Sequence, residues 1–210
     1  TYKIICHFFV GFLLLYVFFD FNRKSKLIKQ LNETLLEKEK LTKELEKIAT
    51  QDSLTGIGNR RYYFDLGSKA FSIAKREKSF LSLITIDIDN FKDINDEFGH
   101  QVGDDVLKLV ASNMISELRK SDILARVGGE EFSIVLPNTD LDKAMLIAEK
   151  IRTKFKNIDY KYKNRAILVT GSFGVSQNLD SDTNLDEIYA RADKALYKAK
   201  SSGKNRVCYS

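Results

Sequence analysis

Apolar side chains dominate the start of the chain, where residues 4–19 carry no formal charge. The run is apolar on every face, and as a helix it would be roughly 24 Å long, against ~30 Å for the hydrocarbon core of a bilayer. The pattern predicts a transmembrane helix over residues 1–21, truncated because the chain begins with Thr1 instead of Met. A buried core helix or a signal-peptide segment are the alternatives. The basic cluster over residues 22–26 then predicts an inner or plasma membrane location, with everything downstream in the cytoplasm.

Residues 22–51 are rich in charge and contain neither Gly nor Pro, which favours a helix. One seam follows 4-3 spacing with two polar positions: Leu27, Leu31, Thr34, Lys38, Leu41, Leu45 and Ile48. A second seam competes with it: Ile28, Leu31, Leu35, Thr42, Leu45 and Ala49. The two seams predict a parallel coiled-coil signalling helix that joins two copies and can exchange registers. A solvated linker helix is the alternative.

Beyond residue 51 the periodicity alternates between helix and strand. Helices are expected at 59–76, 91–98, 104–118, 141–155 and 185–201. Strands are expected at 80–88, 123–127, 132–136, 166–176 and 206–209, and the first is apolar on both faces, which is typical of a central strand. This order predicts an α/β domain of the α+β kind over residues 52–210. Its central sheet is mixed, largely antiparallel and five-stranded, with helices on its faces.

Composition narrows the function classes. The chain of 210 residues has 34 Lys and Arg against 29 Asp and Glu, a net charge of +5. Such a small excess, with no basic stripe or nucleic-acid motif, argues against a nucleic-acid partner. Hydrophobic residues make up 43% of the chain, which is enough to bury a core and excludes low-complexity disorder.

Carboxylates collect at two places. Asp87 and Asp89 stand two residues apart at the end of the central strand, so their side chains project from the same face. Glu130 and Glu131 follow Gly128-Gly129 at the tip of a hairpin, where glycines allow a tight turn and a close approach to a ligand. If hairpin and strand are neighbours, an oxygen-only site results that suits Mg²⁺ or Mn²⁺ and phosphoryl or nucleotidyl transfer. A solvated acidic turn is the alternative.

A signature motif and seven further stretches, in the same order along the chain, carry a family resemblance. The stretch Arg126-Val127-Gly128-Gly129-Glu130-Glu131-Phe132 resembles the signature of GGDEF-domain diguanylate cyclases, in the variant with Glu at the third position. The other matching stretches are Asp52–Gly56, Asn59–Arg61, Asp87–Lys92 with Asn95-Asp96, Phe98–His100, Gly103-Asp104 and Ala199–Asn205. The resemblance covers residues 52–209. It implies a palm-like, nucleotidyl-cyclase-like sheet and a GGDEF catalytic domain that condenses two GTP molecules into cyclic di-GMP and two pyrophosphates. Two domains must face each other, so a homodimer through the coiled coil is expected.

The resemblance also implies roles at the acidic edge. Asp87, Glu130 and the carbonyl of Ile88 are expected to hold two metal ions per active site, Mg²⁺ or Mn²⁺. Glu131 is expected to be a further ligand or the base for the 3′-hydroxyl, with a more distant charged residue as the alternative. Gly128 and Gly129 are expected to pass close to the phosphates, where a side chain would collide.

Further substrate-binding residues follow from the same resemblance. Asn95 and Asp104 are the expected guanine readers, because an aspartate can accept from guanine N1–H and its amine, whereas adenine lacks N1–H. An N-cap on its helix is the alternative role for Asp104. Lys200 and Lys204 are expected to neutralise the triphosphate, with helix-dipole partners as the alternative. The remaining expected substrate-binding residues are Phe91, Lys92 and Arg126.

A regulatory motif completes the set. Arg119-Lys120-Ser121-Asp122 matches the RxxD pattern at which the family binds cyclic di-GMP as a product inhibitor; a helix-end charge pair is the alternative. A catalytically silent cyclic di-GMP receptor is the alternative function. A cyclase acting within a single nucleotide is disfavoured by the hairpin signature and the guanine readers together.

Overall fold

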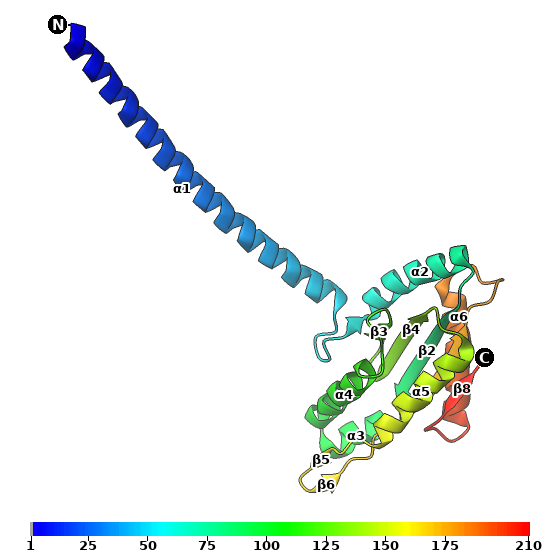
Figure 1. Ribbon diagram of the computed structural model, residues 1–210. Coiled ribbons are helices and arrows are strands. Elements are labelled where there is room, and N and C mark those ends of the chain that lie inside the picture. The colour runs from blue at the N-terminus through cyan, green and yellow to red at the C-terminus, as the bar shows by residue number, and fades with distance from the viewer. Residues whose placement is uncertain (1) are drawn as a thin grey trace. The chain divides into compact units, whose positions relative to one another are not determined.

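The protein is described from a computed structural model, which covers residues 2–210 and gives side chains from residue 9 onward (Figure 1). The chain divides into two units, with the boundary between Lys47 and Ile48. The first unit belongs to α1, a continuous helix of Tyr2–Thr50. This helix includes both the predicted membrane segment and the predicted coiled-coil segment.

The prediction of a transmembrane helix over residues 1–21 is not supported. Among the described residues, no helix is long and apolar enough to cross a membrane. The charge-free run ends at Phe19, and Asp20 forms a 2.7 Å ion pair with Lys24 one turn later.

The second unit is built on one mixed sheet of six strands. In spatial order these are β1 (Gly58–Asn59), β3 (Ile123–Arg126), β4 (Glu131–Pro137), β2 (Leu81–Ile88), β7 (Gly171–Gln177) and β8 (Val207–Tyr209). The pairs β2–β4, β2–β7 and β3–β4 are antiparallel, and the outer pairs β1–β3 and β7–β8 are parallel. A mixed, largely antiparallel sheet with β2 in its interior is therefore confirmed. The predicted number of five strands is wrong, because the two-residue strand β1 is too short for a periodicity to show.

The long strand expected at residues 166–176 is also divided. Its first part belongs to a separate hairpin of β5 (Lys161–Tyr162) and β6 (Arg165–Ala166). Residues 167–170 lie outside any strand, although Ile167 and Val169 are buried and Leu168 is exposed between them. The alternation of apolar residues at 167–169 therefore predicted which side chains are buried, although these residues do not form a strand.

Helices cover both faces of the sheet (Figure 1). On one face α3 (Phe91–Phe98), α4 (His100–Ile115) and α5 (Leu141–Lys156) enclose the larger core. On the other face α2 (Arg60–Glu77) and α6 (Leu185–Ser201) enclose a second core. Asn59, Asp140 and Asn184 cap α2, α5 and α6 by accepting a backbone N–H with their side chains.

The alternation of β2 sends its side chains to both cores. Leu81 and Leu83 face α2 and α6, whereas Ile84 and Ile86 face α3, α4 and α5. Because residues two apart share a face, Asp87 projects on the side of α2 and α6. The acidic residue therefore ends a row of buried side chains at one edge of the sheet.

Candidate active site

The two acidic stretches of the sequence meet at the end of β2. Asp87 lies directly opposite Glu131 on β4, and opposite Ser172 on β7. The backbone N–H of Ile88 donates to the carbonyl of Glu130 at 3.3 Å. The strand ladder thus holds the hairpin turn of residues 128–131 beside Asp87. We call this region the acidic edge.

Asp87 is almost enclosed, with 8% of its surface exposed. Burial raises the pKa of its carboxyl group, the neighbouring carboxylates Glu130 and Glu131 raise it further, and Lys200 opposes them. Lys200 places its Nζ 2.7 Å from an oxygen of Asp87. Among the described residues, no three Asp, Glu, His or Cys side chains are gathered tightly enough to hold a metal ion. In this arrangement the positive charge beside Asp87 comes from Lys200.

Asp89, which was expected to project from the same face as Asp87, has a structural role. Its carboxylate accepts hydrogen bonds from the hydroxyls of Thr170 (2.8 Å) and Ser172 (2.7 Å) and from the backbone N–H of Asn205 (2.9 Å). These donors satisfy both oxygens without a cation. Asp89 thereby fixes the loop after α6, a role that no local sequence signal could reveal because its partners lie more than eighty residues away.

The two lysines of the signature after α6 reach the same edge. Gly174 on β7 lets α6 lie against the sheet, since a Cβ there would stand 2.0 Å from the carbonyl oxygen of Ala192. This close packing brings Lys200, near the end of α6, to Asp87. Lys204 donates to the side-chain oxygen of Asn90. Both expected phosphate-binding lysines therefore flank the end of β2.

The glycines of the hairpin turn differ from each other. A Cβ on Gly128 would stand 2.4 Å from an oxygen of Glu131, whereas a Cβ on Gly129 would meet no atom within 4 Å. Neither glycine is among the residues with positive φ. The close approach of Gly128 and Gly129 to the phosphates stays a prediction. A Cβ on Gly128 would require the flexible carboxylate of Glu131 to move aside.

Arg126 is engaged within the protein. Its guanidinium donates to the carbonyl of Gly129 at 2.7 and 2.9 Å and to the carboxylate of Asp52 at 3.2 Å. Burial raises the pKa of Asp52, but the hydrogen bonds from Thr55 and Arg126 outweigh it and hold that pKa below its usual value. Arg126 thus braces the hairpin turn, and its expected contact with substrate stays a prediction. No local sequence signal reveals this role of Asp52, because it depends on a contact across 74 positions.

The expected guanine readers come together from two helices. Asn95 lies on α3 and Asp104 on α4, and a Cβ on Gly103 would stand 1.9 Å from the side-chain oxygen of Asn95. Both side chains are partly exposed, and neither takes part in a side-chain hydrogen bond with any residue whose side chain is described. The N-cap of α4 is Gly99, so the alternative role of Asp104 as an N-cap is wrong. We call the region around Asn95 and Asp104 the guanine side.

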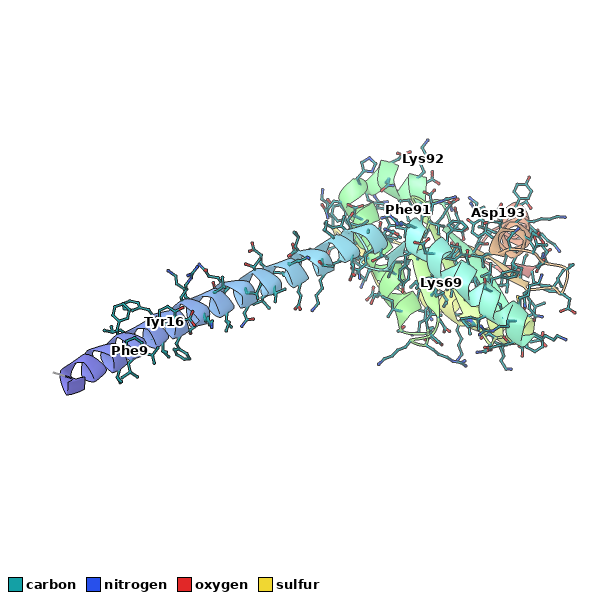
Figure 2. The ribbon with its side chains drawn as sticks, turned by 90° about the horizontal axis from the view of Figure 1, so that it is seen from above. Phe9, Tyr16, Lys69, Phe91, Lys92 and Asp193 are labelled. Atoms are coloured by element: carbon teal, nitrogen blue, oxygen red, sulfur yellow. The ribbon has the colours of Figure 1, made fainter. Side chains whose placement is uncertain are left out.

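Phe91 and Lys92 take opposite positions at the start of α3. Phe91 is buried in the larger core, and its Cζ would be 3.2 Å from a Cβ on Gly103. Lys92 is exposed and points outward (Figure 2). The buried side chain of Phe91 supports the guanine side from beneath. The roles of Phe91 and Lys92 in substrate binding stay predictions.

The RxxD residues form a local turn. The carboxylate of Asp122 accepts from the backbone N–H of Arg119 at 2.8 Å, and the N–H of Asp122 donates to the carbonyl of Arg119 at 3.1 Å. The side chain of Arg119 is exposed. The turn thus orders Asp122 and leaves the guanidinium of Arg119 available at the surface.

Comparison with known proteins decides the family. The family model described as "Diguanylate cyclase, GGDEF domain" matches residues 49–206. This chain belongs to the GGDEF-domain family. A diguanylate cyclase from Vibrio cholerae is 45% identical over 168 residues, which are 80% of this chain and 52% of that protein. Diguanylate cyclase DgcM from Escherichia coli is 37% identical over 183 residues, or 87% of this chain and 44% of that protein. The chain thus spans about half the length of the curated relatives it matches.

Solved GGDEF structures support the same assignment. The coiled coil and GGDEF domain of DgcB from Caulobacter crescentus, in complex with c-di-GMP, superimposes with a TM-score of 0.79 at 30% identity, covering 88% of this chain and 99% of that one. The active GGEEF domain of a diguanylate cyclase from Vibrio cholerae gives a TM-score of 0.68 at 44% identity, covering 72% and 96%. The family resemblance and the α+β fold of the second unit are confirmed.

Proposed function

We propose that this chain is a diguanylate cyclase, which condenses two GTP molecules into cyclic di-GMP and two pyrophosphates. One observation carries the proposal. The ladder between β2 and β4 sets Asp87 opposite Glu131, and Lys200 reaches the same carboxylate from α6. Carboxylates and lysines at one strand end can bind the metal ions and phosphates of a nucleoside triphosphate. Relatives at 45% and 37% identity bear the name diguanylate cyclase.

The donors at the acidic edge fit a divalent cation. They are carboxylate and carbonyl oxygens, which suit Mg²⁺ or Mn²⁺. The residues that would hold two ions per site are Asp87, Ile88 through its carbonyl and Glu130. Glu131 would be either a further ligand or the base that takes the hydroxyl proton. When bound, the ions supply neutralisation of the phosphate charge and activation of the attacking oxygen. Lys200, whose Nζ lies 2.7 Å from an oxygen of Asp87, is placed beside this site, where it could contact the phosphates.

The protein's own residues then complete the transfer. Lys200 and Lys204 bind the triphosphate. The 3′-hydroxyl oxygen of one GTP forms a bond to the α-phosphorus of the other, and the bond from that phosphorus to the bridging oxygen breaks as pyrophosphate leaves. Glu131, which is exposed at the turn, takes the hydroxyl proton where it acts as the base. Repeating the step closes the ring and releases the second pyrophosphate.

Guanine selection is assigned to Asn95 and Asp104. Asp104 can accept from N1–H and the exocyclic amine of guanine, and the amide of Asn95 can serve another edge of the base. An adenine would leave the aspartate unpaired in a partly desolvated place, which costs binding energy. This supports GTP as the substrate over ATP.

The reaction needs two catalytic units, and α1 can supply the pairing. Its apolar seam includes Leu27, Leu31 and Leu45, which are exposed in the single chain. Pairing two such helices in parallel would bury the seam and raise the effective concentration of one domain near the other. We expect a homodimer whose specific activity rises with protein concentration until the dimer is fully formed.

Product inhibition is proposed at Arg119 and Asp122. The exposed guanidinium of Arg119 can pair with phosphate and stack on guanine, and the ordered carboxylate of Asp122 can accept from a guanine edge. Arg119→Ala should retain basal activity and require severalfold more added cyclic di-GMP for half-inhibition. Lys120→Ala is the neighbouring control. Equal inhibition of Arg119→Ala and the unaltered protein would remove the inhibitory site from the proposal.

The experiment that tests the proposed function is identification of the product by mass. The chain is incubated with Mg²⁺ and either GTP or ATP, at concentrations where light scattering shows a dimer. We expect cyclic di-GMP and pyrophosphate from GTP and little turnover of ATP. A dimer that binds cyclic di-GMP and makes none would favour the receptor function.

A further inference from the structure

The β5–β6 hairpin packs against the outside of the guanine side (Figure 1). Its turn residues Lys163 and Asn164 both have positive φ, 49° and 64°, as a two-residue hairpin turn requires. Each strand has only two residues. An isolated hairpin of this size is marginally stable, so contacts with the rest of the domain must fix its position.

One set of contacts joins the hairpin to the end of α3. Arg165 on β6 forms an ion pair with Glu97 and lies over the ring of Phe98, 4.9 Å from its centroid. Tyr162 on β5 packs edge-on against the same ring at 6.4 Å. Glu97 and Phe98 follow Asn95 within one turn of the helix. The hairpin therefore packs against the turn of α3 that carries Asn95, the first expected guanine reader.

A second contact joins the base of the hairpin to α4. The hydroxyl of Tyr160 donates to the carboxylate of Asp105 at 3.0 Å. Asp105 directly follows Asp104, the second guanine reader. The two ends of the hairpin segment are joined by a hydrogen bond, which the N–H of Ile167 donates to the carbonyl of Tyr160 at 2.9 Å. Ile167 is buried in the larger core and anchors this end of the segment.

The spacing between α3 and α4 is narrow at this point. Only Gly99 separates the two helices in sequence, and the side-chain oxygen of Asn95 occupies the space where Gly103 would carry a Cβ. A small shift of either helix would change how Asn95 and Asp104 meet a base. The hairpin segment contacts α3 and α4 next to these residues, so a change in the hairpin can change the distance between the two helices.

We propose that the β5–β6 hairpin is a clamp that sets the guanine side, with Arg165 and Tyr160 as positioning residues for guanine recognition. The inference rests on the proposed function for the identity of the base. Neither residue needs to touch the nucleotide, because Arg165 acts through Glu97 and Phe98, and Tyr160 acts through Asp105. The acidic edge lies on other elements, so the clamp should affect binding of the base and leave the chemical step unchanged.

The test compares Tyr160→Phe and Arg165→Ala with Lys161→Ala. Lys161 is in the same hairpin, and its ion pair is with the exposed Asp159 of the same segment. We expect KM for GTP to rise about threefold to tenfold in the first two variants, since each loses one or two surface contacts. We expect kcat within about twofold of the unaltered protein. Lys161→Ala should behave as the unaltered protein.

Two further readouts separate positioning from general support of the fold. With inosine triphosphate, which lacks the exocyclic amine, the loss in the two variants should be smaller than with GTP. Thermal unfolding should show that the variants are folded at the assay temperature. Unchanged KM in both variants, or a parallel fall of kcat with GTP and inosine triphosphate alike, would overturn the clamp.

Calorimetric binding of GTP keeps this test separate from the proposed function. If the unaltered chain makes no cyclic di-GMP, the proposed function fails, and GTP affinity then decides the clamp alone. A dissociation constant that rises severalfold in Tyr160→Phe and Arg165→Ala, and stays the same in Lys161→Ala, supports it. Equal dissociation constants in all four proteins, or no measurable binding of GTP by the unaltered chain, contradict it.

Discussion

The acidic edge belongs to the sheet, whereas the guanine side belongs to two helices. Asp87 and Glu131 lie on neighbouring strands whose backbones pair over seven residue positions. Asn95 and Asp104 lie on helices α3 and α4, which side-chain contacts hold together. A strand ladder fixes the relative positions of its residues more rigidly than side-chain packing does. The difference suggests that the chemistry has a rigid base and that base recognition depends on the surroundings of α3 and α4.

The largest effect is expected at the acidic edge. Glu130→Ala should lower kcat by about 10²-fold or more, because it removes a carboxylate from the site of the divalent ions. Folding should be intact, since the contact of residue 130 with β2 runs through its backbone carbonyl. Synthesis of cyclic di-GMP measures the loss. Glu77→Ala at the end of α2 is the control, and normal synthesis by Glu130→Ala would refute the metal assignment.

The guanine side should show a change in selectivity instead. Asp104→Ala should reduce the ratio of kcat/KM for GTP to that for ATP by about 10²-fold, since the discriminating acceptor is lost. The acidic edge is intact in this variant, so turnover at saturating GTP should persist. Asp93→Ala, on the exposed first turn of α3, provides the control. A preserved preference for GTP in Asp104→Ala would assign guanine recognition elsewhere.

A pair of glycine variants tests the rigidity of the acidic edge. Gly174→Ala should lower the free energy of unfolding by about 1–3 kcal/mol, because its Cβ would overlap the backbone of α6. Gly129→Ala should change it by less than about 0.5 kcal/mol, because no atom lies within 4 Å of the added carbon. Urea unfolding measures both. Equal stability of the two variants would show that α6 is not fixed by its contact with β7.

The smallest effect is a pH dependence at Asp87. Burial raises the pKa of this carboxyl group in the folded protein, so the folded state favours the protonated form. The associated stabilisation is present below the ordinary pKa of about 4 and is lost as the pH rises through the folded-state value. The stability of Asp87→Asn relative to the unaltered protein should therefore increase from acid to neutral pH. A difference that is constant with pH would contradict the assigned environment of Asp87.

Strong periodicity predicted most of the fold. The helix at 185–201, the central strand and the hairpin before and after Gly128-Gly129 all appear within one or two residues of their expected bounds. The start of α4 was missed because Gly99 and Gly103 read as loop residues. In the structure Gly103 is buried inside the helix, where the side chain of Asn95 takes the space of a Cβ. A glycine required for packing cannot be distinguished from a glycine in a turn without its neighbours.

The candidate site divides in the same way. Short-range patterns place Asp87 and residues 130 and 131 at strand ends, and they predict an approach only if the hairpin and β2 are neighbours, which the structure shows them to be. Two other features of the site could not be predicted. Arg126 and Asp52 brace the hairpin turn, and Thr170 and Asn205 donate hydrogen bonds to Asp89. Those contacts join positions far apart in the sequence, and their donors are residues that also occur commonly at surfaces.

Binding of Mn²⁺ in the presence of GTP, followed by electron paramagnetic resonance, tests the central claim most directly. We expect the spectrum of free Mn²⁺ to be replaced by that of bound Mn²⁺ with the unaltered chain and with Glu77→Ala. Asp87→Ala and Glu130→Ala should each bind the ion much more weakly. Equal binding of Mn²⁺ by all four proteins would contradict the claim that the end of β2 and the hairpin turn form one metal site.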